Sequence, residues 1–172
     1  MAEDTEQETN HEEKAELILL ESYERSPRLA ELKVAYRSRT KARERRPMRS
    51  PKDVENYLRA VWTKDTLELV EEFLVICLNG SHEATGWVKV SSGGLNATVV
   101  DPRLVFAVAL QKASVAIIVA HNHPSGSLSP SDRDRQVTHT LKAAGELLGI
   151  AVLDHVILTR ESSFSFQENG LL

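Results

Sequence analysis

The sequence predicts an α/β domain in which helices flank a mixed β-sheet, and three observations lead to that prediction. Apolar residues make up 41% of the 172 residues, enough for a packed core, whereas aromatic residues make up only 5%. Short apolar runs, typical of buried strands, are interleaved with longer amphipathic segments, typical of helices. The helical segments begin at residues able to cap them, and a glycine follows the longest. The length suits one domain with some additional chain at an end.

Residues 1–49 are predicted to form a charged extension ahead of a domain at 50–172. Residues 1–13 are acidic and polar and are expected to be disordered, and residues 14–37 carry a helical pattern. Eight lysines and arginines follow between Arg37 and Lys52. Such a stretch could contact nucleic acid or an acidic partner. A solvated linker is the favoured interpretation, because no aromatic residue is interleaved to stack on bases.

The first half of the domain is predicted to contain one helix and two strands. Ser50 can cap a helix that begins at Pro51, since the fixed φ of proline suits a first helical position. Residues 73–78 form an apolar run that predicts a buried strand, and the Asn-Gly pair at 79–80 is a turn signal. Residues 86–91 are expected to form a second strand.

The second half alternates helices and strands. Asp101 can cap a helix that begins at Pro102 and runs to about residue 112. Residues 114–120 form a continuous apolar strand, as expected at the covered centre of a sheet. A helix is expected over 131–148, ended by Gly149, and a strand over 150–158. A last short strand is expected at 164–166.

Composition limits the cellular compartment and the partners that we expect for the protein. The formal net charge of −4 gives no general argument for binding nucleic acid or anionic membranes. Cys77 is the only cysteine, which excludes disulfide frameworks and cysteine-based zinc sites and favours a reducing compartment. The N-terminus lacks the basic and apolar regions of a signal peptide. Apolar runs such as 115–120 are far shorter than the roughly 20 residues that span a bilayer. We therefore expect a soluble cytoplasmic protein that does not engage a membrane.

The residues that carry chemistry lie between 121 and 134. His121 and His123 follow the end of a buried strand, where residues two apart project from the same face and can meet one metal ion. Asp134 lies in the first turn of the next helix, which returns its carboxylate toward the strand end. Two imidazoles and one carboxylate suit zinc, and three protein ligands leave a fourth position open for water, as in catalytic sites.

The spacing H-x-H-x7-S-x-x-D, filled by His121, His123, Ser131 and Asp134, resembles the JAMM motif of the JAB/MPN metallopeptidase family. The stretches LNATVVDPR (95–103), AHNHPSG (120–126) and LDHVIL (153–158) are similar to those of RadC-type JAB domains. The resemblance covers roughly residues 50–172 and implies a single JAB/MPN-type domain with one Zn²⁺ ion. It implies that His121, His123 and Asp134 are the metal ligands and that Ser131 helps to stabilise an oxyanion.

The resemblance also implies a glutamate base on the strand before the motif. In the family this glutamate stands two residues before a phenylalanine, which corresponds to Glu71 before Phe73. Alternation along a strand puts Glu71 and Phe73 on one face and Glu72 on the other. Glu71 is therefore the preferred base, and Glu72 is the alternative.

Other interpretations remain open at this point. Ser131 could also cap the helix, which is compatible with catalysis. Asp154 and His155 could orient the site or form a structural pair. For the whole chain, the implied function is a zinc-dependent metallopeptidase or isopeptidase that cleaves an amide bond in a peptide or protein. The alternatives are a nucleic-acid-associated protein of the DNA-repair type and a JAB module that binds a partner without catalysis.

Overall fold

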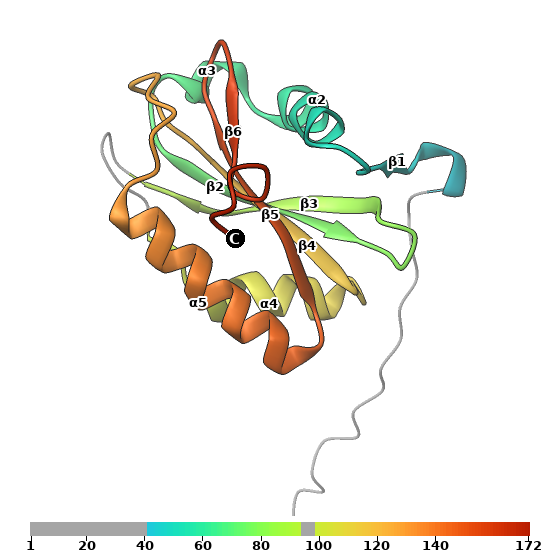
Figure 1. The fold of residues 1–172 in the computed structure, drawn as a ribbon. Helices are drawn as coiled ribbons and strands as arrows, with labels where there is room; N and C mark the ends of the chain where they lie inside the picture. The colour runs from blue at the N-terminus through green and yellow to red at the C-terminus, as the bar shows by residue number, and fades with distance from the viewer. Residues whose placement is uncertain (1–40, 94–98) are drawn as a thin grey trace, which may run out of the picture. The chain divides into compact units, whose positions relative to one another are not determined.

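A computed structural model describes residues 41–93 and 99–172 (Figure 1). The disorder predicted for 1–13 and the helix predicted within 14–37 lie outside these residues. The elements follow the order 3₁₀-helix η1 (Ala42–Glu44), β1 (Arg46–Pro47), α2 (Pro51–Val61), α3 (Lys64–Leu67), β2 (Glu72–Leu78), β3 (Glu83–Ser92), α4 (Pro102–Gln111), β4 (Ala116–Asn122), α5 (Asp132–Leu148), β5 (Ala151–Leu158) and β6 (Ser163–Ser165).

The strands form one six-stranded sheet in the order β1-β3-β2-β4-β5-β6. β4 and β5 run parallel, and the other neighbouring strands run antiparallel. Helix α5 makes the crossover between the two parallel strands, as parallel pairing requires. The predicted α/β domain with a mixed sheet flanked by helices is confirmed.

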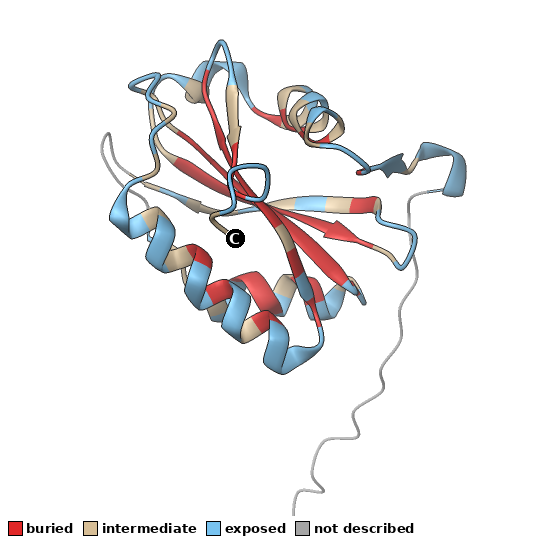
Figure 2. Cartoon of the chain, in the orientation of Figure 1, coloured by how far each residue is buried: buried red, intermediate tan, exposed pale blue. Residues whose placement is uncertain are grey.

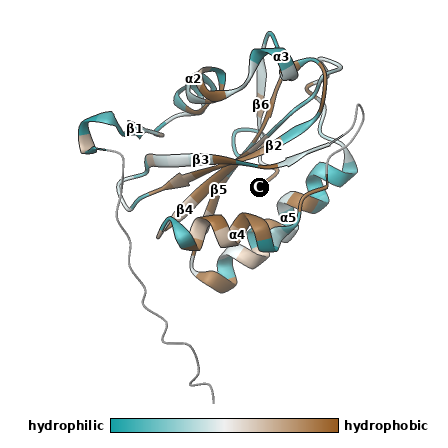
Figure 3. Cartoon of the chain, turned by 180° about the vertical axis from the view of Figure 1, so that it is seen from behind, coloured by the Kyte–Doolittle hydropathy of each residue, from teal (hydrophilic) through white to brown (hydrophobic). Residues whose placement is uncertain are grey.

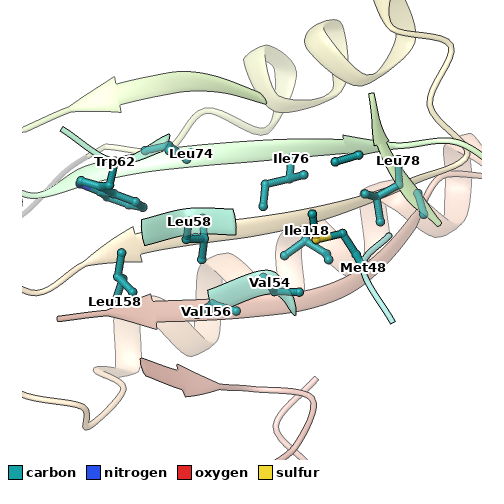
Figure 4. Close-up of a cluster of buried hydrophobic side chains, with 13 residues drawn as sticks. Met48, Val54, Leu58, Trp62, Leu74, Ile76, Leu78, Ile118, Val156 and Leu158 are labelled. Carbon is teal, nitrogen blue, oxygen red and sulfur yellow. The ribbon is translucent and has the colours of Figure 1, made fainter. Parts of the chain in front are cut away.

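Helices cover both faces of the sheet, with α2 on one side and α4 and α5 on the other (Figure 1). Strands β2 and β4 are buried along their whole length at the centre (Figure 2). On the α2 side, Val54 and Leu58 pack over Ile76, Ile118 and their neighbours (Figure 4). Because both faces are covered, these strands are apolar over Phe73–Leu78 and Ala116–Ala120 and do not alternate with polar residues there.

The opposite core layer is built from the other set of side chains on the same strands. Phe73, Val75 and Cys77 of β2 pack with Val105 of α4 and Leu141 of α5. Seen from behind, α4 is mostly apolar, α5 carries both polar and apolar residues, and the central strands are largely apolar (Figure 3). Cys77 is buried as a free thiol, and burial raises its pKa.

Three elements were not expected from the sequence: η1, β1 and α3. Helix α3 is a single turn before β2, and β1 pairs with β3 at Arg46–Pro47, ahead of the predicted domain start at residue 50. Met48, which follows β1, is 6% exposed and belongs to the α2-side core. The boundary at 49/50 stays a prediction. Within residues 41–93 and 99–172, no helix has the length and apolar character needed to cross a membrane.

Candidate metal centre

Two histidines mark the end of the central strand β4. His121 lies within β4, directly opposite Phe73 of β2, and is 1% exposed. Its ring stacks on the Phe73 ring with centroids 6.3 Å apart. His123 follows the strand and is held by hydrogen bonds from its backbone N–H to the Leu158 carbonyl (3.0 Å) and between its Nδ1 and the Ser127 carbonyl (2.8 Å). The backbone that carries both rings is therefore held in place by strand pairing and hydrogen bonds.

The carboxylate of Asp134 is delivered by the start of α5. Ser131 is the N-cap, and a capping box joins it to Asp134: the Asp134 N–H donates to Ser131 Oγ (3.2 Å), and the Ser131 N–H donates to Asp134 Oδ2 (2.7 Å). The Ser131 hydroxyl also donates to Oδ2 (2.6 Å). These bonds fix the carboxylate, and the helix N-terminus favours its negative charge.

The three candidate ligands converge on one point. His121 Nε2 lies 3.0 Å from His123 Nε2 and 3.2 Å from Asp134 Oδ1, and His123 Nε2 lies 3.7 Å from Asp134 Oδ2. One potential ligand atom from each residue lies within 4.8 Å of the others. Among the described residues, these form the one group of histidine, cysteine and acidic side chains with this property.

The charges of the cluster are linked. Burial by itself would raise the pKa of the Asp134 carboxyl, but the hydrogen bonds with His121 and His123 outweigh it and hold the pKa well below its usual range. The hydrogen bond with Asp134 raises the pKa of the His123 imidazole against its partial burial. The nearby charge of Glu71 raises the His123 pKa further. The site is therefore an ionised carboxylate beside an imidazole that readily holds a proton.

The residues present suit a divalent metal ion. Two nitrogens bound to tetrahedral zinc at about 2.1 Å would stand about 3.4 Å apart, and the His121 and His123 Nε2 atoms are already 3.0 Å apart. Two lone pairs at that distance repel unless a proton or a metal ion lies between them. In the described part of the chain Asp134 has only these histidines as ion-pair partners. The cluster can therefore hold a metal ion with three protein ligands.

The two adjacent glutamates at the start of β2, Glu71 and Glu72, differ in their surroundings. Glu72 is buried on the α2 side, where it pairs with Lys89 and accepts a hydrogen bond from the Thr66 hydroxyl (2.9 Å). Glu71 is half-buried on the same face of the sheet as Phe73, and its charge raises the pKa of His123. Its backbone carbonyl accepts a hydrogen bond from Gly93 (2.8 Å).

Three further residues support the site, and sequence reasoning had singled out only one of them. His155 of β5 contacts His121, and Thr138 of α5 contacts His155. Asn122, between the two histidines, points to the other side of the sheet and binds the backbone around Glu71. The Asp-His pair at 154–155 had signalled His155. Nothing local distinguishes Thr138 or Asn122, because their partners lie far away in the sequence.

The fold and cluster place the chain among the JAB domains, and comparison with known families agrees. The RadC-like JAB domain matches residues 48–171, and the chain belongs to this family. It is 49% identical over 102 residues to a UPF0758 protein of Trichlorobacter lovleyi, covering 59% of this chain and 44% of that protein. It is 43% identical over 126 residues to a UPF0758 protein of Alkaliphilus metalliredigens, covering 73% and 53%. The chain spans about half the length of these curated relatives.

Proposed function

We propose that the protein is a zinc-dependent hydrolase that cleaves an amide bond in a peptide or protein, with His121, His123 and Asp134 as metal ligands. The convergence of the three ligand atoms within 4.8 Å at the end of a rigid strand carries the proposal. Bound in such a site, zinc polarises a carbonyl group and lowers the pKa of a water molecule to about 7. The proposed setting is the cytoplasm, which the single, buried and reduced Cys77 supports.

Glu71 is the proposed general base. The antiparallel register pairs Phe73 with His121, and the same register carried two residues further sets Glu71 opposite His123. A carboxylate there can take a proton from the attacking water and return it to the leaving amine. Glu72 is a poor candidate, since its carboxylate is already engaged by Lys89 and Thr66 on the other face.

Ser131 is proposed to have two roles: to hold the carboxylate of Asp134 in place and, when substrate is bound, to donate a hydrogen bond to the oxyanion. Its hydroxyl hydrogen is directed at Asp134 Oδ2, so it steadies the carboxylate in the absence of substrate. To donate to an oxyanion, the hydroxyl has to rotate away from Asp134 when the carboxylate binds the metal.

The first test is the metal content of the purified chain, measured by elemental mass spectrometry without chelators. We expect close to one zinc ion per chain, lost in His123→Ala and Asp134→Ala. Asp132→Ala is the matched control, because Asp132 is an exposed carboxylate in the same helical turn. Well-folded wild-type protein that takes up no zinc would overturn the proposal and favour a JAB module that only binds a partner.

The second test separates the base from the ligands. With internally quenched peptides as substrates, Glu71→Gln should retain zinc and lose hydrolysis by about 100-fold or more, the scale of general base catalysis. Glu72→Gln is the control and should retain both. Equal loss in the two variants would contradict the assignment of Glu71.

A further inference from the structure

A continuous chain of hydrogen bonds runs from the backbone of α5 to the proposed ligand His121. Thr138 Oγ1 lies 2.6 Å from the Asp134 carbonyl oxygen and 2.6 Å from His155 Nδ1. The other nitrogen of His155, Nε2, lies 2.8 Å from His121 Nδ1. Thr138 is 2% exposed, and His121 and His155 are each 1% exposed, so water cannot substitute for any of these partners.

The direction of each bond follows from the number of hydrogens available. The Asp134 carbonyl can only accept, so the single hydroxyl hydrogen of Thr138 is donated to it. Thr138 must then accept from His155, which places a hydrogen on His155 Nδ1. His155 is 1% exposed, and its hydrogen-bond partners, Thr138 and His121, carry no negative charge that would offset the cost of burying an imidazolium, so His155 is neutral. His155 Nε2 is therefore bare and accepts from His121 Nδ1.

We infer that His155 and Thr138 are positioning residues that keep a hydrogen on His121 Nδ1, and so leave Nε2 as the nitrogen that faces the metal site. In the metal-free protein this Nε2 lies 3.2 Å from Asp134 Oδ1 and can donate to it. A histidine ligand usually relies on a carboxylate, a backbone carbonyl or water for this purpose. His123 follows that rule through the Ser127 carbonyl. His121 depends instead on a second imidazole, whose own tautomer is set by Thr138.

The packing around this series of hydrogen bonds explains why the arrangement is stable. His155 is stacked on Phe166 with ring centroids 4.6 Å apart and is fixed by pairing of β5 with β4, where it lies opposite Val119. The Asp134 carbonyl at the far end belongs to the residue whose side chain is a proposed ligand. The hydrogen bonds therefore tie two of the three ligands together through α5 and β5. The role of the metal in this inference rests on the proposed function, whereas the tautomer of His121 does not.

The tautomer can be measured in the metal-free protein by ¹⁵N–¹H correlation spectra of the histidine rings, with the His121 signals assigned by their loss in His121→Gln. We expect a hydrogen on His121 Nδ1 in the wild type. Thr138→Val should remove this hydrogen, because His155 loses its acceptor, moves its own hydrogen to Nε2 and then donates to His121 Nδ1. Thr138→Ser should restore the wild-type spectrum. Thr140→Val is the matched control, since its hydroxyl makes the same bond one turn back, to Gln136, without touching a histidine.

Zinc affinity provides a second readout in the same variants. Thr138→Val and His155→Phe should each weaken zinc binding by about 10- to 100-fold, the range for such supporting partners, while Thr138→Ser and Thr140→Val should not. A His121 Nδ1 without a hydrogen in the wild type, or an Nδ1 hydrogen that persists in folded Thr138→Val, would overturn the inference. If the wild type binds no zinc, the proposed function fails, and the spectra still decide the tautomer.

Discussion

The side chain of Asn122 supplies hydrogen-bond partners to three backbone groups at the junction of α3 and β2. It accepts from the Glu72 N–H (2.7 Å) and donates to the carbonyls of Leu67 (2.7 Å) and Val70 (2.8 Å). Asn122 is fully buried. Asn122→Ala therefore leaves one donor and two acceptors without their side-chain partner. The bond from the Glu72 N–H is buried, and the two bonds to the carbonyls are partly buried. At about 1–2 kcal/mol for each of the three groups, the free energy of unfolding should fall by about 3–6 kcal/mol.

Asn79→Ala is a closely matched control. Asn79 also makes three side-chain hydrogen bonds, two to backbone N–H groups of Ser81 and Glu83 and one to the Glu83 carboxylate, all between 2.9 and 3.0 Å. Its turn is half-buried and the Ser81 partner is exposed, so water can replace much of what is lost. We expect a cost of about 1 kcal/mol.

The two variants can be compared by urea denaturation followed by circular dichroism. With a slope of about 2 kcal/mol per molar urea, Asn122→Ala should lower the midpoint by about 2 M and Asn79→Ala by about 0.5 M. Losses that agree within about 1 kcal/mol would show that burial of the Asn122 partners does not set the cost, and would refute the reasoning.

Three further outcomes follow from the charges and the packing. The pKa of His123 is raised, chiefly by its hydrogen bond with Asp134, so zinc has to displace a proton from this imidazole. The zinc affinity, measured by chelator competition, should therefore rise about tenfold per pH unit from pH 6 upward until that pKa is passed. A zinc affinity that does not depend on pH would contradict this. In the metal-free protein the same raised pKa stabilises the fold below the unfolded value of about 6.5, and that stability is lost as the pH rises through the folded value. Gly145→Ala should lower the free energy of unfolding by about 1–3 kcal/mol, although Ala is normally the better helix former, because its Cβ would lie 2.4 Å from the Ile150 carbonyl. Gly80→Ala, with nothing within 4 Å of its Cβ, should leave the thermal midpoint nearly unchanged.

The features that sequence reasoning reached are those encoded locally. The caps at Ser50, Asp101 and Ser131 and the left-handed Gly149 are found where they were expected. A strand end and a helix start are local features, so the spacing of His121, His123 and Asp134 was enough to predict that they meet. Their convergence follows from two short segments and needs no knowledge of the rest of the fold.

The features that sequence reasoning did not reach depend on pairing across the chain. β3 begins at Glu83, three residues before the predicted start, because Ala84 pairs with both Leu78 and β1. The partners of Asn122 lie 50 to 55 residues earlier in the sequence. Thr138 contacts a histidine 17 residues later, across the return from α5 to β5. No local pattern marks such residues, since their roles appear only when the sheet has formed.

The register between β2 and β4 is what joins the proposed ligands to the proposed base. The ladder ends at the pair Phe73–His121, so Glu71 and His123 lie just beyond it. A slip of one residue would turn every β2 side chain to the opposite face and replace Glu71 by Glu72 beside the cluster. The bond from the Glu72 N–H to Asn122 Oδ1 extends the pairing one step beyond the ladder and prevents that slip. The residue between the two histidines therefore constrains the base from the face of the sheet on which no chemistry is proposed.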